Sequence, residues 1–286
     1  MCVPAAWMPA LLLALILLFV GCVPGGSRSD GVPSEDAPFT LTALDVGQGD
    51  AFLLRAPGAV VLVDTGEPDA DVVRLLRGEG VARLDLLVIT HAHLDHVGGA
   101  PDVLAKLPVD VVWMHPAPDA SDVVPQYAAT LREAERRGVP VRAPPAGARV
   151  AVGDLQLEVL GPPPGRPYAW TASELNNTSL VLRASLAGAG SVLLAGEVER
   201  EAQADLLRSV PDRLRVDVLA VPHHGSRTSD PAFLLATGAH TAVLSVGVAN
   251  RHGHPHDETL EVIERAGMLL HRTDRDGTVR VVVGGG

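Results

Sequence analysis

The segment ITHAHLDHVGG, residues 89–99, places three histidines and an aspartate within six positions, His91, His93, Asp95 and His96. Two alternate residues of an extended segment point the same way, and the turn that follows brings the next two side chains back towards them. Imidazole and carboxylate groups are the usual ligands of zinc and similar divalent ions. The four side chains together have the spacing that two neighbouring metal sites require.

Histidines elsewhere in the chain are also clustered. Eight of the eleven fall in three short groups, of which the first is the segment above. The other two groups are His223 and His224, and His252, His254 and His256. Histidines scattered through a hydrophobic core would not cluster in this way, so these residues are candidates for a functional site.

The elements that must position these residues alternate between strand-like and helical runs. Strands are expected at residues 39–47, 50–56 and 59–64, a helix at 69–80, and a buried strand at 84–90 that leads into the histidine-rich loop. The mixture continues to residue 283, with strands both in adjacent pairs and alternating with helices. Mixed sheets covered by helices are therefore the expected architecture.

Length and composition bound the possibilities. A chain of 286 residues with 47% hydrophobic residues can bury a full core. The formal net charge is −11, so a general electrostatic attraction to polyanions is not expected. Any contact with nucleic acid would have to be local.

The first twenty-two residues differ in character from the rest. An apolar run from Ala10 to Val20 is too short to span a bilayer comfortably, and it is expected to be a secretion signal. The stretch FVGC resembles the lipobox of bacterial lipoproteins, which would make Cys22 the lipidated residue and hold the exported protein on a membrane. A plain signal peptide or an uncleaved anchor stays open as the alternative.

The expected domain organisation follows from this leader. Residues 1–22 would be the signal peptide, residues 23–38 are polar and rich in Gly, Ser and Pro and would form a flexible linker, and residues 39–286 would form one domain. Cys2 and Cys22 are the only cysteines. The mature chain is therefore expected to have no disulfide and no cysteine metal ligand.

Several ordered motifs resemble a known family. HAHLDH resembles the first metal motif of the metallo-β-lactamase superfamily. LTALDVGQGDAFLL, VDTG, LNNTSLVLR, LLAGEVE, LAVPHHGS, HGHP and HRTDRDGTVRV resemble, in the same order, the lactamase-like domain of the ComEC family of DNA-uptake proteins. The resemblance covers about residues 39–284. It implies an α/β fold, the αββα four-layer sandwich, in a stand-alone domain with its metal site along one edge.

The resemblance also implies a set of metal ligands for two divalent ions, Zn²⁺ or Mn²⁺. These ligands are His91, His93, Asp95, His96, Glu197 and His224. The first two would hold one ion, Glu197 would bridge, and the others would hold the second ion. Relatives carry aspartate at the bridging position, so Glu197 could either bridge with looser geometry or serve one ion only.

Further residues receive roles around these ligands. Asp64 would orient them through hydrogen bonds. Asp45 and Asp50 lie in DVGQGD, where an active-site role and a purely structural turn role are equally open. His223 would act with Asp95 in catalysis by donating a hydrogen bond or a proton to the leaving group. For His254, the same role and that of a loop histidine beside a proline turn are equally open.

Substrate contacts are expected from three segments. Asn176 and Asn177 occupy the segment in which many superfamily members carry a histidine ligand, and an amide oxygen is a weaker zinc ligand than imidazole. Arg227 and Arg251 could bind phosphate or be surface charges. Tyr168 and Trp170 could stack on bases, or they could cover the edge of the core.

The function expected from these residues is that of an exported, metal-dependent hydrolase that attacks a phosphodiester with a metal-activated water, with DNA among the candidate substrates. Two alternatives stay open. One is a hydrolase of small esters, such as a choline phosphate esterase or a lactonase. The other is a metal-binding or DNA-binding module in which Glu197 marks the loss of catalysis.

Overall fold

The computed structural model describes residues 33–34, 37–117, 124–165, 167–248 and 250–284. Two seven-stranded sheets organise these residues. The expected signal peptide with Cys22 lies outside the described residues, as does most of the expected linker. Among the helices of the described residues, none is both long and apolar enough to cross a membrane.

The first sheet is built mainly from the N-terminal half of the chain. Its strand order is β14 (Val279–Val282), β1 (Thr40–Ala43), β2 (Phe52–Ala56), β3 (Ala59–Val63), β4 (Leu86–Ile89), β5 (Val112–Met114) and β6 (Val141–Arg142). The last strand in sequence, β14, pairs antiparallel with β1, so that Val282 lies opposite Thr40. The two ends of the described fold therefore lie side by side.

The second sheet is built from consecutive strands. Its order is β13 (Leu269–Arg272), β12 (Thr241–Leu244), β11 (Val218–Ala220), β10 (Gly190–Leu194), β9 (Val181–Leu186), β8 (Leu155–Gly161) and β7 (Arg149–Val152). Strands β7 to β10 are antiparallel, whereas β10 to β13 are parallel. This mixture of hairpins and crossovers agrees with the sequence pattern.

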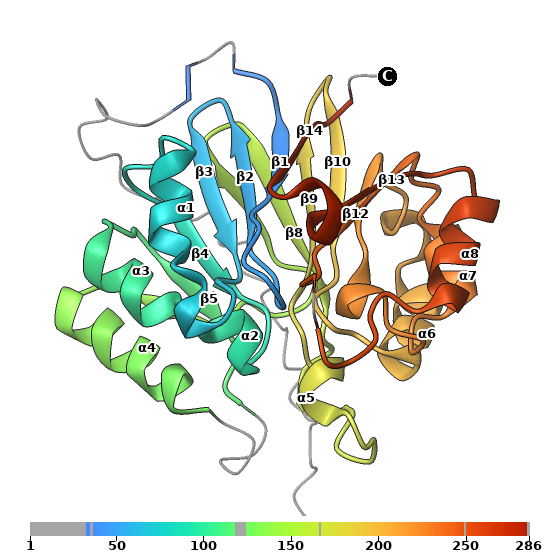
Figure 1. Ribbon diagram of the computed structural model, residues 1–286. Helices are drawn as coiled ribbons and strands as arrows, with labels where there is room; N and C mark the ends of the chain where they lie inside the picture. Colours follow the sequence, from blue (N-terminus) through green and yellow to red (C-terminus); the bar gives the residue numbers. More distant parts are fainter. Residues whose placement is uncertain (1–32, 35–36, 118–123, 166, 249, 285–286) are drawn as a thin grey trace, which may run out of the picture.

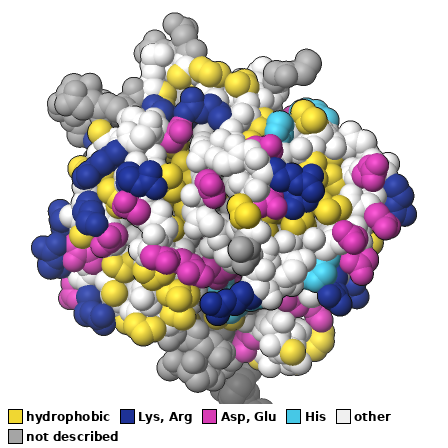
Figure 2. Space-filling view, viewed as in Figure 1, with side chains coloured by type: hydrophobic (Ala, Val, Ile, Leu, Met, Phe, Trp, Pro, Cys, Tyr) yellow, Lys and Arg dark blue, Asp and Glu magenta, His cyan; other side chains and the backbone are white. Residues whose placement is uncertain are grey.

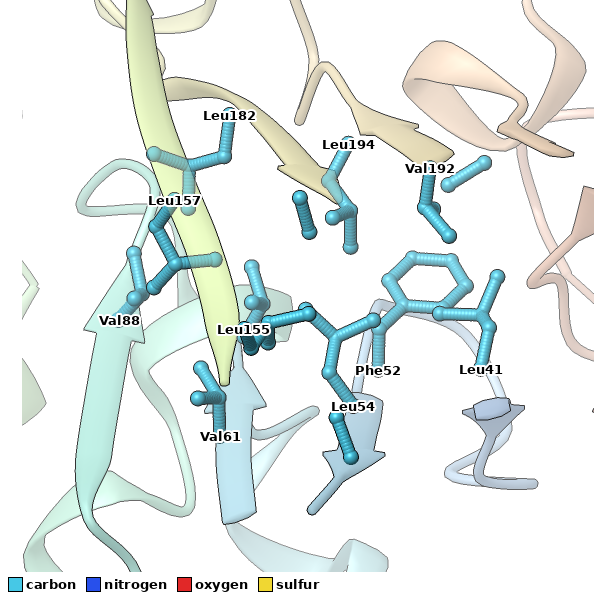
Figure 3. Close-up of a cluster of buried hydrophobic side chains, with 14 of the residues drawn as sticks. Leu41, Phe52, Leu54, Val61, Val88, Leu155, Leu157, Leu182, Val192 and Leu194 are labelled. Carbon is cyan, nitrogen blue, oxygen red and sulfur yellow. The ribbon is translucent and has the colours of Figure 1, made fainter. Parts of the chain in front are cut away.

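Alternating side chains give each sheet two buried faces. In β2, Phe52 and Leu54 point into the space between the sheets, whereas Leu53 packs against the helices on the outer face. In β10, Leu194 likewise points into the space between the sheets, and Leu193 packs against the helices on the outer face. Figure 3 shows the inner cluster, in which side chains of the first sheet meet those of the second. Because both faces are buried, most residues of these strands are apolar, and the apolar residues are not confined to alternate positions.

Helices cover the two outer faces and connect the parallel strands. On the first sheet lie α1 (Val72–Gly78), α3 (Ala100–Lys106) and α4 (Pro125–Arg137), and on the second lie α6 (Arg200–Ser209), α7 (Pro231–Ala236) and α8 (Asp257–Arg265) (Figure 1). The layers are thus helices, sheet, sheet, helices. The expected αββα sandwich is confirmed.

Short helices lie at one edge of this sandwich. They include α2 (Leu94–Val97), which follows β4, and α5 (Glu174–Asn177), which precedes β9; both lie at the lower edge in Figure 1. Parallel strands end at a common edge, and ligands of α/β proteins bind outside the carboxyl ends of such strands. The loops after β3, β4, β10, β11 and β12 are therefore the segments in which a site is expected.

Candidate metal centre

The predicted ligands are brought together from loops of both sheets. His91 and His93 follow β4 in the first sheet, Glu197 follows β10 in the second, and His224 lies in the 3-10 helix η3 (Pro222–Gly225) after β11. Asp95 and His96 belong to α2. All six predicted metal ligands thus meet between the ends of the two sheets, and they form two groups that could each hold an ion.

The first group contains His91, His93 and Glu197. The Nε2 atom of His91 lies 3.0 Å from Nδ1 of His93 and 3.0 Å from Oε2 of Glu197. The distance from His93 Nδ1 to the same carboxylate oxygen is 3.1 Å. Two imidazole nitrogens and one carboxylate oxygen therefore converge on one point, as the ligands of a single cation would.

The second group contains Asp95, His96, Glu197 and His224. The Nε2 atom of His224 lies 3.0 Å from Glu197 Oε1 and 3.4 Å from Asp95 Oδ2, and His96 Nε2 lies 3.4 Å from Glu197 Oε1. Both Nε2 atoms are buried. Their contacts with the carboxylates lack the angles of a hydrogen bond, so neither atom has a hydrogen-bond partner among the described residues. A buried nitrogen without a partner is costly unless another ligand completes it.

The opposite ring nitrogens explain why these Nε2 atoms face the centre. His96 Nδ1 lies 2.8 Å from Asp64 Oδ2, and His224 Nδ1 donates to the carbonyl oxygen of Ser245 over 3.0 Å. The hydroxyl of Thr90 donates to Asp64 and accepts from His91 Nδ1. In each ring the proton on Nδ1 is fixed, which leaves the lone pair of Nε2 for a metal.

The backbone at the site adopts conformations that few side chains favour. Asp64, His223 and His224 have φ values of 61°, 50° and 52°, in the left-handed region. Such residues cost on the order of 1–3 kcal/mol each and persist only where the surrounding structure holds them. At this site, the strained backbone orients the side chains of His223 and His224. It also orients the Asp64 carboxylate, which supports His96.

The charges of the ligands are strongly coupled. Burial opposes charge on every group, but the neighbouring carboxylates of Asp50, Asp64 and Asp95 raise the pKa of His96 and His224 well above the ordinary range. Burial also opposes the ionised form of Glu197 and Asp95, yet the adjacent histidines hold the pKa of both carboxyls low. Burial and the charge of His96 lower the pKa of His91 to about 4.

These residues fit a pair of divalent cations. The two unpartnered Nε2 atoms are the observation that tests the fit, because a metal would complete both of them. The two oxygens of Glu197 face different groups, Oε2 towards His91 and His93, and Oε1 towards His96 and His224. The glutamate is therefore placed where a bridging ligand belongs. A third group consists of Asp50, Asp64 and His96. Its two carboxylates lie beside the Nδ1 atoms of the ligands His224 and His96.

A cavity of about 230 Å³ opens above the ligands. Its walls include the ligands His93, Asp95, Glu197 and His224, and its other lining residues are Gln48, Glu67, Leu94, Asn176, His223, His252 and His254. The ring centroids of His223 and His254 are 5.5 Å apart. Burial and the charges of His223 and His224 lower the pKa of His254 to about 3, so this ring is neutral near pH 7.

Several residues expected near the site lie elsewhere. The Asp45 carboxylate is exposed and accepts from the backbone of Gly47, whereas Asp50 is buried and lies 3.3 Å from His224 Nδ1. Of the two roles left open for these carboxylates, Asp45 therefore has the turn role, and Asp50 lies at the site. Asn177 is fully buried away from the cavity and accepts from the backbone N–H of Glu199, so of the two asparagines only Asn176 lines the cavity.

The charged and aromatic candidates for substrate contact are not among the residues that line the cavity. Arg227 donates to His256 Nε2 over 2.8 Å and does not line the cavity, and Arg251 is exposed. Tyr168 is buried in the core behind the second sheet, whereas Trp170 is 75% exposed. Figure 2 shows arginine and acidic side chains interspersed over one face of the molecule.

The structure adds three residues that the sequence motifs did not single out. Gln48 and Glu67 line the cavity, and Glu199 contacts two of its walls. Gln48 lies within DVGQGD and Glu199 within LLAGEVE, so both belong to segments that carry the resemblance. No signal in the sequence distinguishes Glu67 from an ordinary surface glutamate.

Comparison with known proteins agrees with this fold and site. The family model of the metallo-beta-lactamase superfamily matches residues 44–247. ComE operon protein 3 of Bacillus subtilis (strain 168) is 31% identical over 83% of this chain and 32% of its own length. Competence protein ComA of Neisseria gonorrhoeae is 30% identical over 95% of this chain and 36% of its own length. The chain thus spans about a third of the length of these relatives.

Solved structures show the same fold at low identity. Igni18, a metallo hydrolase from the archaeon Ignicoccus hospitalis, has a TM-score of 0.53 and 16% identity, over 85% of this chain and 98% of that chain. CmlA, a diiron beta-hydroxylase from Streptomyces venezuelae, has a TM-score of 0.56 and 16% identity, over 88% of this chain and 55% of that chain.

Proposed function

The chain belongs to the metallo-beta-lactamase superfamily, a family of metal-dependent hydrolases, and from this premise we propose that it is a phosphodiesterase with DNA among its substrates. The observation that carries the proposal is the position of Glu197. Each of its oxygens faces a separate group of ligands, so one carboxylate can hold two cations close together. Two cations with a shared ligand suit the hydrolysis of phosphate esters.

The metal ions, once bound, would lower the pKa of a water towards neutrality and polarise the phosphate under attack. The protein supplies the rest of the chemistry. Asp95 and Glu197 provide the negative charge that holds the cations; Glu197 is buried, and Asp95 is partly exposed to the cavity. His223 and His254 also line the cavity, where His254 can donate a hydrogen bond to a phosphate or leaving-group oxygen and His223 can accept one from the attacking water. Because His254 is neutral near pH 7, its contribution is a hydrogen bond and not a formal charge.

The relatives favour a nucleic acid over other phosphodiesters. ComA of Neisseria gonorrhoeae is named as a competence protein, and the motifs of this chain resemble those of DNA-uptake proteins. The cavity of about 230 Å³ suits a phosphate with the adjoining sugar more closely than a duplex. A single strand or a strand end is therefore the form of DNA that we propose as substrate.

Position 197 provides the experiment that tests the proposal. The purified full-length chain, loaded with Zn²⁺ or Mn²⁺, should hydrolyse bis(p-nitrophenyl) phosphate and single-stranded DNA. Glu197→Asp should keep both ions and change turnover only modestly, since aspartate retains the shared carboxylate. Glu197→Gln should be severely impaired, because it removes the shared negative charge between two cations.

Other outcomes would favour the alternative functions. Turnover of a choline phosphate ester or a lactone, with none of either phosphodiester, would identify a small-ester hydrolase. A wild type that binds metal, hydrolyses none of these compounds and gains nothing from Glu197→Asp would be a binding module.

We also propose that the protein is exported and held on a membrane through a lipid on Cys22. The support is the apolar leader that ends in FVGC. Cells supplied with labelled fatty acid should incorporate it into the wild type and not into Cys22→Ser. Release of the wild type into the medium as an unlabelled chain would contradict the lipid anchor.

A further inference from the structure

Glu199 lies two residues beyond the bridging glutamate, and its carboxylate contacts two walls of the cavity that come from different elements. Its Oε1 atom accepts a hydrogen bond from Asn176 Nδ2 over 3.1 Å. The same oxygen lies 3.4 Å from Nδ1 of His223. Asn176 belongs to α5, whereas His223 belongs to η3, so one oxygen atom links two otherwise separate loops.

The two contacts of the Glu199 side chain take the place of the capping hydrogen bond that is usual at its position in α6. Glu199 is the N-cap residue of α6, where a side-chain oxygen usually accepts from the backbone of the first turn. Its side chain makes no such capping bond. The carboxylate turns instead towards Asn176 and His223, although the helix keeps the benefit of a negative charge at its N-terminus.

The contacts of His223 fix which of its nitrogens carries a proton. Thr228 Oγ1 lies 3.2 Å from His223 Nδ1 and itself donates to Ser226 Oγ, so it accepts from the ring. Glu199 Oε1 is a second acceptor on the same side. Nδ1 therefore bears the proton, and Nε2 is left on the cavity side, 3.7 Å from Glu197 Oε1.

The contact with Asn176 orients its amide in the same way. Because Nδ2 donates to Glu199, the amide oxygen points away from it. That oxygen is buried and has no hydrogen-bond partner among the described residues, although Asn176 lines the cavity. An acceptor left free in a buried position is costly, so its orientation has to be maintained by the bond that Nδ2 makes.

We propose that Glu199 is a positioning residue, which holds His223 in the Nδ1–H tautomer and holds the Asn176 amide in one orientation at the wall of the cavity. The proposal rests on the proposed phosphodiesterase function. The Nε2 atom of His223 then faces the cavity as an acceptor, which can take a hydrogen bond from the attacking water. Both walls keep their spacing because they share one anchoring atom.

Glu201 provides the matched control. It carries the same charge in the first turn of the same helix, and its Oε2 atom accepts from Asn177 Nδ2 over 3.3 Å. Asn177 faces away from the cavity. Alanine at either position therefore removes one negative charge from the first turn of the helix. Only Glu199→Ala also removes the contacts that hold residues of the cavity wall.

Turnover of bis(p-nitrophenyl) phosphate by the full-length, metal-loaded chain gives the first measurement. Glu199→Ala should lower kcat about 10- to 100-fold with a KM within about threefold, as expected when groups that act in the transition state lose their support. Glu199→Gln should restore kcat to within about threefold of the wild type, because its amide oxygen can accept from both donors. Glu201→Ala should stay close to the wild type. An equal loss in Glu201→Ala, or unchanged kcat in Glu199→Ala, would overturn the proposal.

The second measurement does not depend on activity. Long-range ¹H–¹⁵N spectra of the zinc-loaded chain, labelled at histidine and assigned with His223→Gln, report which nitrogen of His223 carries the proton. The wild type and Glu201→Ala should show the Nδ1–H form, and Glu199→Ala should show a mixture of tautomers. If the wild type hydrolyses no phosphodiester but the spectra differ in this way, the proposed function fails and the positioning role stands. Identical spectra in the wild type and Glu199→Ala would exclude that role.

Discussion

At the scale of single residues, two buried nitrogens decide what the site can bind. The Nε2 atoms of His96 and His224 have no hydrogen-bond partner among the residues described, whereas their Nδ1 atoms are anchored by Asp64 and Ser245. The rings are thus held ready before a ligand arrives. A metal gains affinity from such ligands, because little conformational freedom remains to be lost on binding.

Metal binding should therefore depend on these two rings. The wild type should retain at least one Zn²⁺ or Mn²⁺ per chain, and the double variant His96→Ala, His224→Ala should lose the site that contains Asp95. Alanine at His115, which lies 2.9 Å from the carbonyl oxygen of Pro144, should have no effect. Elemental analysis after gel filtration measures the content. Equal metal in the wild type and the double variant would contradict this assignment.

Protonation of the histidines predicts how stability depends on pH. Burial lowers the pKa of His91 to about 4 and that of His254 to about 3, whereas both rings titrate near pH 6.5 in the unfolded chain. Between pH 6.5 and 4.5 the unfolded state thus binds more protons, and stability falls as the pH falls. The pKa of His96 and that of His224 are raised, so protonation of these two rings stabilises the fold fully below pH 6.5. This stabilisation is lost as the pH rises, and it therefore does not change between pH 6.5 and 4.5.

The free energy of unfolding of the metal-free chain should accordingly fall by about 2 kcal/mol from pH 6.5 to pH 4.5, mostly through the fully buried His91. Urea denaturation with a chelator present measures the change. His91→Gln should flatten the dependence, and a glutamine at the exposed His240 should leave it as in the wild type. Stability that stays constant or rises over this interval would disprove the prediction.

Most ligands could be predicted from the sequence because four of the six lie in one short loop. The sequence could not resolve residues whose direction depends on a neighbouring element. Asn176 and Asn177 are adjacent in one helical turn and point to different sides, so only packing against α6 decides which one lines the cavity. Asp45 and Asp50 flank one turn, and the close contact of that turn with α2 selects Asp50.

At the scale of elements, the loop between β1 and β2 approaches the first turn of α2 closely. A Cβ atom on Gly49 would lie 2.2 Å from the carbonyl oxygen of Asp95, and the backbone φ there is +117°. The N–H of Asp50 donates to the same carbonyl oxygen. Glycine at this position lets the loop support the metal-binding turn from behind.

Gly49→Ala should consequently destabilise the fold by more than about 2 kcal/mol and weaken metal binding, because either the loop or Asp95 has to move. Gly47 offers a control, since its φ of +75° is also left-handed but nothing lies within 4 Å of a Cβ there. Gly47→Ala should cost only the backbone penalty of about 1 kcal/mol. Chemical denaturation and metal content measure both variants, and equal effects would refute the argument from close approach.

The elements themselves followed well from the sequence pattern. Residues 50–56 and 59–64, expected as strands, contain β2 and β3, and the helix expected at 69–80 contains α1. Local periodicity was sufficient there because each element buries a continuous apolar face. The order of strands within the sheets could not be obtained in this way, since the pairing of β1 with β14 joins residues about 240 positions apart.

At the scale of the whole molecule, the candidate metal centre joins the two halves of the sandwich. His91, His93, Asp95 and His96 come from the first sheet, and Glu197 and His224 come from the second. Hydrogen bonds such as those from Leu180 to Thr90 and from Ser245 to Gly49 already connect the two sheets at this edge, and the ligands face one another as close carboxylates and histidines. A bound cation would therefore act as a clamp between the sheets.

Metal should raise the stability of the entire fold and not of one loop alone. At a free Zn²⁺ concentration a hundredfold above Kd, the expected gain is about 2.7 kcal/mol. Calorimetry should show one transition that moves to higher temperature with metal and back with chelator, and Glu197→Ala should abolish most of the shift. Two separate transitions, of which metal moves only one, would show that the halves unfold independently.

The pairing of β14 with β1 has a consequence for biosynthesis. The second sheet consists of strands that are consecutive in the chain, so it can assemble as they leave the ribosome. The first sheet lacks its outer strand, β14, until Val279–Val282 has been translated. Before that point β1 has only β2 beside it. Until then one side of β1 stays unpaired in the nascent chain, and β14 then pairs with it as the outer strand of the completed sheet.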